Sequence, residues 1–274
     1  PIWFRWLGRL AAPLFFYALA VGFQHTRNRK KYLLRLYLAN VGMVFFNQIM
    51  CMLQRKLDYV AYQPKNHNIF TTLFCAGVLI CIWENRKEKK KFFTYIGIYI
   101  FWQAMVMGLA ILAEAFDYVW RGNALLQTVL RTNYIFPLLG GIWDAEGGVF
   151  FIVLGIWLYC AVENKWKLAL RYILFCGAYM FMCQGDILYR IMSRFSFWGY
   201  HKLADVIYFG SSFVGIPLGT SDLSLLTEFY QWMMIGALPI MLSCNGKRGK
   251  SLKWLFYAAY PLQFLVLYGI SYYK

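Results

Sequence analysis

Acidic residues and histidines are scarce in this chain. Its 274 residues include 12 Asp and Glu and three His, against 28 Lys and Arg, and charged residues make up only 15%. Hydrophobic residues make up 61%, which leaves too few polar side chains to cover a soluble domain of this size. The composition therefore excludes an ordinary soluble domain and predicts an integral membrane protein.

Several familiar chemical motifs are also missing. The seven cysteines form no Cys-x-x-Cys pair, so their scattered positions favour small apolar fillers over metal ligands. The sequence has no Walker-type phosphate loop, no serine-centred nucleophile elbow and no His-Glu-x-x-His motif. These absences predict that the protein binds no metal and belongs to none of the enzyme classes that use these motifs.

The surplus of basic residues lies in short loops. A net charge of +16 in a soluble protein would indicate nucleic acid, but here the cations gather in "HTRNRKKYLLR", "ENRKEKKK", "ENKWK" and "NGKRGKSLK". These loops alternate with less basic ones, which is typical of the cytoplasmic side of a multi-pass membrane protein. We therefore expect no nucleic-acid partner.

Apolar stretches long enough to cross a bilayer recur between these loops. We expect a polytopic all-α bundle that forms a single transmembrane domain over residues 1–274, with about eight spans at 6–24, 35–53, 69–84, 92–115, 145–162, 168–185, 225–243 and 252–271. The loop charges place residue 1 outside the cell, so we also expect one further N-terminal span in the full protein. The connection 117–144 is apolar enough to lie on the membrane or to re-enter it.

Charges inside the spans are few, and each one is a candidate for function. Arg9 lies about one turn into the first span, where it either extends its side chain to the outer surface or faces an internal site. Asp144 and Glu146 stand together in "GGIWDAEGGVFF". They either complement a helix N-terminus or take a proton from an amine or hydroxyl nucleophile.

The cytoplasmic cations have two interpretations. The first is that they only orient the protein in the membrane. The second is a phosphate cradle, in which "CNGKRGKSLK" and "HTRNRKKYLLR" supply glycine N–H groups and positive charge. The candidate donor-binding residues are His25, Arg27, Arg35, Asn245, Lys247 and Arg248. Arg35 is the most informative of these, because it falls just inside an apolar run.

Several collinear blocks identify a family. "LGRLAAPLF…GFQHTRNRKKYLLRL", "NIFTTLF", "WDAEGGVFFIVLGIWLY" and "NGKRGKSLKWLFYAAYPLQFLVLYGI" resemble the TraX family of bacterial membrane proteins. That family is similar to a larger group of membrane acyltransferases. The resemblance implies a multi-pass protein of the bacterial inner (plasma) membrane that transfers an acetyl group from cytoplasmic acetyl-CoA. The implied acceptor is extracytoplasmic, a pilin N-terminus or a surface glycan.

The chain departs from the family pattern at two places. Relatives open with a helix that carries an Asp-His pair, and this sequence begins after that helix would end. Gln263 stands where many relatives have His. Within these residues we therefore expect Asp144 and Glu146 to supply the base, while Arg9 and Tyr260 line the path of the acyl arm. Two other classes remain open: a transporter or flippase of an anionic or lipid-linked substrate, and a scaffold without turnover.

Overall fold

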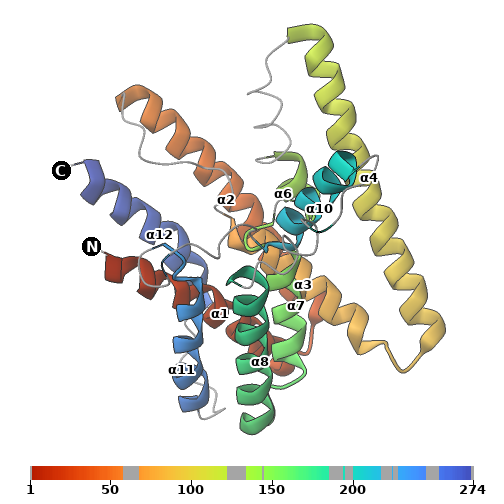
Figure 1. Ribbon diagram of the computed structural model, residues 1–274, viewed down its shortest axis with the longest axis vertical. Helices are drawn as coiled ribbons and strands as arrows, with labels where there is room; N and C mark the ends of the chain where they lie inside the picture. The colour runs from red at the N-terminus through yellow and green to blue at the C-terminus, as the bar shows by residue number, and fades with distance from the viewer. Residues whose placement is uncertain are drawn as a thin grey trace. The chain divides into compact units, whose positions relative to one another are not determined.

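The computed structural model describes residues 2–57, 68–121, 134–143, 145–184, 194, 200–216, 224, 228–244 and 253–272. Every regular element in these ranges is helical, which confirms the all-α fold class (Figure 1). The elements are α1 (Ile2–His25), α2 (Arg29–Leu57), α3 (Ile69–Glu84), α4 (Lys89–Arg121), α6 (Phe136–Leu138), α7 (Gly148–Tyr159), α8 (Lys165–Gln184), α10 (Tyr200–Val214), the 3-10 helix η2 (Gln231–Gly236), α11 (Ala237–Ser243) and α12 (Lys253–Tyr272).

Three helices in the described ranges are long and apolar enough to cross a membrane. They contain Arg29–Leu53 of α2, Lys89–Ala113 of α4 and Lys165–Cys183 of α8. Shorter apolar helices cover Ile69–Glu84, Gly148–Tyr159, Gln231–Ser243 and Leu255–Ile270. Each of the eight predicted apolar stretches thus contains helix, and the number of about eight spans stays a prediction.

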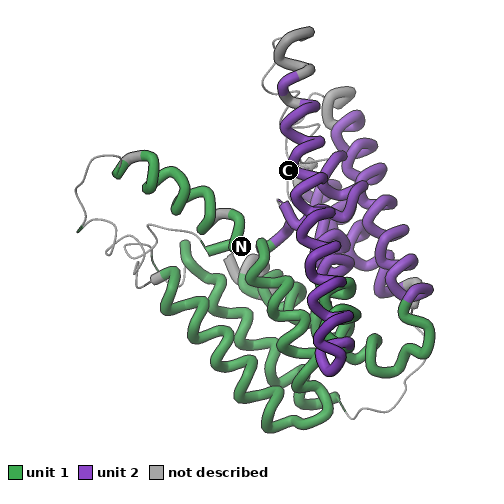
Figure 2. The backbone as a smooth tube through the Cα atoms, turned by 90° about the vertical axis from the view of Figure 1, so that its right-hand side faces the viewer, with its two compact units in different colours: residues 1–29, 76–84, 147–245 green, residues 30–75, 85–146, 246–274 purple. Residues whose placement is uncertain are grey.

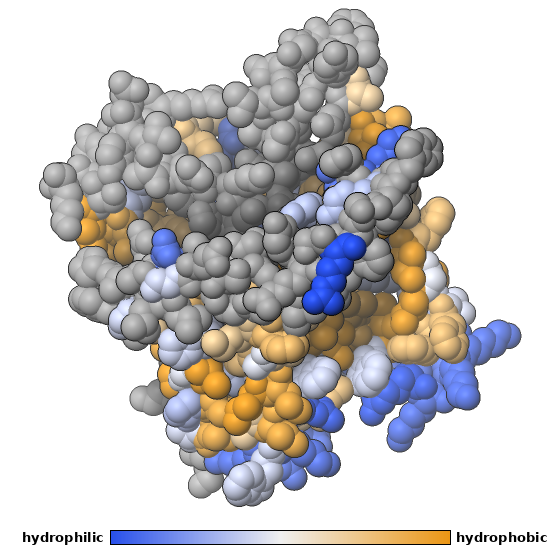
Figure 3. Space-filling model, viewed as in Figure 1, coloured by the Kyte–Doolittle hydropathy of each residue, from blue (hydrophilic) through white to orange (hydrophobic). Residues whose placement is uncertain are grey.

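Large apolar side chains stand on the outside of the helices. On α4 these include Phe93, Ile98, Phe101 and Leu112, all exposed. Apolar residues cover much of the visible described surface, and hydrophilic ones gather in separate groups, one of them over the turn between α3 and α4 (Figure 3). A surface this apolar is stable when lipid surrounds it, so the exposed residues agree with a membrane protein.

Two predicted spans differ from the observed helices, and both differences have local causes. The span predicted from residue 145 begins as α7 at Gly148, because Gly147 and Gly148 have positive φ angles of 78° and 67° and interrupt the helix there. The span predicted at 225–243 is η2 followed by α11. Pro239 lies in the first turn of α11, where its missing N–H costs no hydrogen bond, so the α-helix starts just before it.

The chain folds as two compact units (Figure 2). Unit 1 contains residues 1–29, 76–84 and 147–245, and unit 2 contains residues 30–75, 85–146 and 246–274. Helices α2 and α3 contribute residues to both units. The expectation of one transmembrane domain over residues 1–274 stays a prediction.

Unit 1 is built around α1, α7 and α8. Helix α1 packs on α7, η2 and α11, while α8 packs on α7, η2 and α11, and α10 packs on α7. Gly155 allows α7 to pack closely, because an added Cβ would lie 2.9 Å from the Cβ of Ala76 and 3.2 Å from the ring of Phe16. Aromatic rings pack against one another in this unit: the ring centroids of Phe150 and Phe175 are 4.3 Å apart, with the planes tilted by 36°.

The glycine pair before α7 makes a backbone contact with the end of α10. A Cβ on Gly148 would lie 2.5 Å from the amide nitrogen of Gly215, and a Cβ on Gly215 would lie 2.2 Å from the carbonyl oxygen of Gly147. Gly215 also has a positive φ of 89°. Only glycine fits these positions, so the "EGG" sequence joins the start of α7 to the end of α10.

Unit 2 holds the segment 134–143, which contains the short helix α6 and continues as irregular backbone. Side chains from α2 and α4 donate hydrogen bonds to four successive carbonyl groups: Asn40 to Pro137 (2.6 Å), Tyr37 to Leu138 (2.8 Å), Trp102 to Leu139 (2.9 Å) and Gln103 to Gly140 (3.1 Å). Irregular backbone inside a membrane protein is stable only when its polar groups are paired in this way. The polar residues of these apolar helices therefore have a structural role.

A further set of hydrogen bonds orients Asn40. Its Oδ1 atom accepts hydrogen bonds from the amide of Asn68 (2.8 Å) and the hydroxyl of Thr71 (2.7 Å), and all three residues are buried. These two donors on and just before α3 fix the carboxamide, so that its NH₂ group points at Pro137. The "NIFTTLF" block thus supports the 134–143 segment.

Candidate functional site

Two of the predicted site residues meet in unit 2. The hydroxyl of Tyr260 on α12 donates a hydrogen bond to Oε2 of Glu146, with the two oxygens 2.6 Å apart. Tyr260 is buried, with 4% of its surface exposed, and Glu146 is half-buried. A hydrogen bond to a carboxylate at this distance is charge-assisted and holds the acid in one orientation.

The surroundings of Glu146 are fixed by α3 and α12. The hydroxyl of Thr72 donates to the backbone carbonyl of Glu146 at 3.0 Å. The ring of Phe70 packs edge-on against Tyr260 with the centroids 5.7 Å apart, and Phe264 packs on it at 5.1 Å. Tyr260 lies seven residues after the start of α12 at Lys253, about 10 Å along the helix axis. The carboxylate is therefore bound by a residue away from the end of α12, and an acid kept among apolar helices is a candidate for function.

Arg9 lies on α1 in unit 1 and is half-buried. Its guanidinium carbon lies 4.9 Å from the centroid of the Tyr230 ring, a cation–π contact. It also interacts electrostatically with Tyr179, whose hydroxyl donates to the carbonyl of Gly215 at 3.4 Å. Arg9 thus contacts an aromatic ring of unit 1, although the sequence also allowed a side chain directed to the outer surface.

The predicted donor-binding cations fall into three groups. His25 and Arg27 are exposed at the turn after α1, in unit 1. Arg35 is exposed on α2 in unit 2, where it interacts electrostatically with Tyr32 and Tyr257. The predicted residues outside the described ranges are Asp144, Asn245, Lys247 and Arg248. The phosphate cradle therefore stays a prediction.

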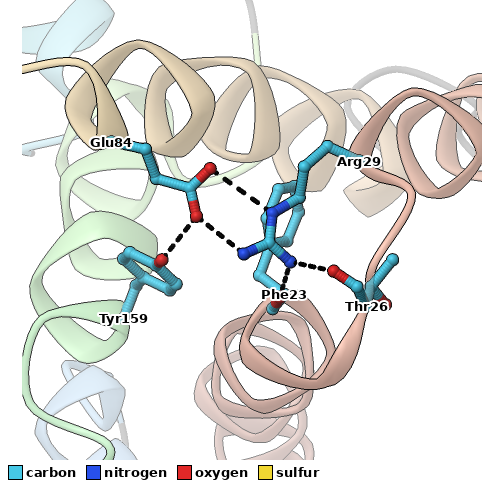
Figure 4. A network of polar contacts seen from close by, with 5 residues as sticks. All are labelled: Phe23, Thr26, Arg29, Glu84 and Tyr159. Atoms are coloured by element: carbon cyan, nitrogen blue, oxygen red, sulfur yellow. Dashed lines mark hydrogen bonds and ion pairs between the residues drawn. The ribbon is translucent and has the colours of Figure 1, made fainter.

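Unit 1 also contains a polar network that was not predicted from the sequence (Figure 4). The guanidinium of Arg29 holds the carboxylate of Glu84 at two points, from Nη2 to Oε1 (2.8 Å) and from Nε to Oε2 (3.3 Å). The hydroxyl of Tyr159 donates to the same Oε1 atom at 2.6 Å. The network joins the start of α2, the end of α3 and the end of α7.

Arg29 also binds the end of α1. Its Nη1 atom donates to the carbonyl oxygens of Phe23 and Thr26, as Figure 4 shows. Carbonyl groups in the last turn of a helix have no partner within the helix. The guanidinium therefore pairs with carbonyl groups at the end of α1 and with a half-buried acid at the same time.

One signal in the sequence could have revealed this network. Glu84 is the last residue of the apolar run 69–84, and a carboxylate at a helix C-terminus is repelled by the helix dipole. Such an acid needs a cation beside it. The sequence offers many nearby cations, so it indicates that a partner exists but does not say that the partner is Arg29.

No group of three or more His, Cys, Asp or Glu side chains that could hold a metal occurs in the described ranges. Comparison with known families adds a separate finding: a family model described as TraX protein matches residues 1–181. The chain belongs to the TraX family. The match covers Arg9, Arg29, Glu84 and Glu146 of this TraX protein. The resemblance of residues 245–270 to later family blocks lies beyond the matched range and stays a prediction. No curated protein and no solved structure matches the chain.

Proposed function

We propose that this TraX family protein is an integral membrane acetyltransferase with about eight spans in the bacterial inner membrane. Its donor is acetyl-CoA on the cytoplasmic side, and its acceptor is an amine or hydroxyl on an extracytoplasmic pilin or glycan. The observation that best supports a catalytic function is the carboxylate of Glu146, bound by Tyr260 at 2.6 Å inside unit 2. Glu146 is half-buried, and an acid kept among apolar helices is a functional candidate by default.

In the proposed reaction the acceptor attacks the acetyl carbonyl carbon of the thioester. The new C–N or C–O bond forms, the C–S bond breaks, and CoA leaves as the thiol or thiolate. The carboxylate of Glu146 takes the proton from the acceptor, and Tyr260 keeps that carboxylate oriented. Asp144 is a second candidate base, and the guanidinium of Arg9 offers positive charge to the developing carbonyl oxyanion.

The donor is proposed to bind through its phosphate groups. His25, Arg27, Arg35, Asn245, Lys247 and Arg248 are the candidate residues, since arginines and backbone amides recognise phosphate well. The exposed positions of His25, Arg27 and Arg35 leave these side chains accessible from solvent. Charged phosphates do not enter a hydrocarbon layer, so they stay at the cytoplasmic side. Only the acyl arm of the donor then reaches Glu146.

The test uses the purified full chain in lipid vesicles and acetyl-CoA labelled on the acetyl group. Wild-type protein should move the label onto an envelope fraction that contains pilins and glycans. Glu146→Gln should lower this transfer about 100-fold or more, because glutamine accepts the Tyr260 hydrogen bond but cannot take a proton. Glu163→Gln is the matched control, since Glu163 is exposed in the turn after α7 and should tolerate the same change.

The alternatives give different results in the same assay. A transporter or flippase leaves the label on CoA, and a scaffold neither binds nor consumes acetyl-CoA. Equal activity of Glu146→Gln and wild type would exclude Glu146 as the base. A separate experiment identifies the acceptor: mass spectrometry compares envelope polymers from a deletion strain and its parent, and the acceptor carries an acetyl group only in the parent.

A further inference from the structure

The turn after α1 presents its cations in two different ways. His25 and Arg27 are exposed, whereas Arg29, two residues further on, is directed into unit 1 with 29% of its side chain exposed. All three residues belong to the same basic stretch of sequence, which gave no reason to separate them. The three residues therefore differ in role: of the three, only Arg29 is bound to a carboxylate, while His25 and Arg27 are exposed.

The contacts of Arg29 fix both sides of the turn. One nitrogen binds the carbonyl of Phe23 in the last turn of α1, and the same nitrogen binds the carbonyl of Thr26 between the two helices. The remaining two nitrogens bind Glu84. A planar guanidinium with all its groups engaged allows the turn little freedom, which a lysine ammonium would not achieve.

Tyr159 holds the network from the other side. Its hydroxyl binds Oε1 of Glu84, and its ring packs edge-on against Phe23 with the centroids 6.4 Å apart. The carboxylate is thus fixed by α7 as well as by Arg29. The turn that carries His25 and Arg27 is tied through one acid to α3 and α7.

We propose that Arg29, Glu84 and Tyr159 are positioning residues, which hold the 25–28 turn in the conformation that binds a phosphate group of the CoA donor. The inference rests on the proposed function, since it names the donor that the turn serves. Preorganised binding groups lose less conformational entropy when they bind, so a rigid turn gives higher donor affinity without contacting the reacting atoms.

The experiment measures the dissociation constant of CoA and the kinetic constants for acetyl-CoA, with the full chain in lipid vesicles. Tyr159→Phe removes one hydroxyl and keeps the ring. It should raise the CoA Kd and the acetyl-CoA KM about tenfold, equivalent to about 1.4 kcal/mol, with kcat unchanged. Arg29→Lys keeps the charge but loses the planar fork, so it should show the same split between KM and kcat.

Tyr172→Phe is the matched control. Tyr172 also lies in unit 1 and its hydroxyl also donates a short hydrogen bond, to the carbonyl of Met234 at 2.5 Å. The control loses a comparable contact elsewhere, so its Kd and KM should equal those of wild type. Thermal unfolding of each variant shows whether the two tyrosine changes destabilise the protein equally.

Three results would be decisive. A rise in Kd for Tyr159→Phe and Arg29→Lys but not for Tyr172→Phe supports the positioning role. Equal Kd values for both tyrosine variants, in a protein whose wild type binds CoA, overturn it and leave the proposed function intact. If the wild type binds no CoA, the proposed function fails, and the positioning role fails with it.

Discussion

The backbones of Gly148 and Gly215 lie in direct contact, so closely that a Cβ on Gly148 would be 2.5 Å from the amide nitrogen of Gly215. Gly148 also has a φ of 67°, which alanine adopts at a cost. The contact links α7 to α10, two elements that are separated by a long stretch of chain. A substitution at this contact therefore tests the packing of unit 1, whatever the function of the protein is.

We expect Gly148→Ala to destabilise the protein by at least about 2 kcal/mol, because strain in φ and a backbone collision add together. The measurement is thermal unfolding in detergent. Gly177→Ala in α8 is the control: nothing lies within 4 Å of its Cβ position, and alanine favours helix. Equal melting temperatures for the two variants would contradict the contact.

Replacing Asn40 tests the support of the 134–143 segment. Asn40→Leu removes the donor to Pro137, leaves the hydroxyl of Thr71 without its acceptor, and leaves the amide of Asn68 with only the backbone carbonyl of residue 40. Buried groups that lose a partner cost about 1–3 kcal/mol each, so the free energy of unfolding should fall by several kcal/mol. Thr94→Ala on the exposed side of α4 should change it little. A double-mutant cycle with Asn68→Ala should show non-additivity, and simple addition would exclude a shared network.

Gln103 makes a second, independent test of the same segment. Its amide donates to the carbonyl of Gly140 at 3.1 Å and its carbonyl accepts from the N–H of Ile142 at 2.9 Å. Gln103→Leu should lower the free energy of unfolding by about 2–4 kcal/mol, since two backbone groups lose their partners. Met105→Leu on the same helix is the control, and hydrogen exchange at Ile142 should rise only in the Gln103 variant. Unchanged exchange there would mean that the contact is dispensable.

Tyr260→Phe separates the two roles that Tyr260 could have. If the hydroxyl orients Glu146, kcat should fall about tenfold to a hundredfold and the donor KM should stay constant, because a hydrogen bond to a charged group is lost. If Tyr260 contacts the donor instead, KM should rise. Steady-state kinetics with acetyl-CoA distinguishes these results, and Tyr208→Phe on the exposed side of α10 should leave both constants unchanged.

The sequence predicted the helices well where composition decides them. The run at 69–84 has the bounds of α3, because apolar residues fill it and polar ones follow. Helix α10, between the predicted spans 168–185 and 225–243, was not predicted, because it is short and amphipathic and therefore lacks the long apolar run of a membrane span.

The candidate site was predicted as residues but not as an arrangement. Glu146 was predicted as a retained charge and Tyr260 as part of the path of the acyl arm, yet 114 positions separate them, and no local pattern shows that they meet. Arg29 and Glu84 are 55 positions apart and have many alternative partners in the basic loops. The pattern of apolar residues predicts whether lipid, water or protein surrounds a helix. It does not predict which polar side chains pair with one another, so these pairs became known only from the structure.

The 134–143 segment also constrains how this protein can change over time. In a water-soluble loop a lost side-chain donor is replaced by a water molecule at small cost. Among helices such as α2 and α4, which are apolar enough to cross a bilayer, no such substitute is at hand. Tyr37, Asn40, Trp102 and Gln103 should therefore tolerate as little variation as the apolar residues that fill the interior.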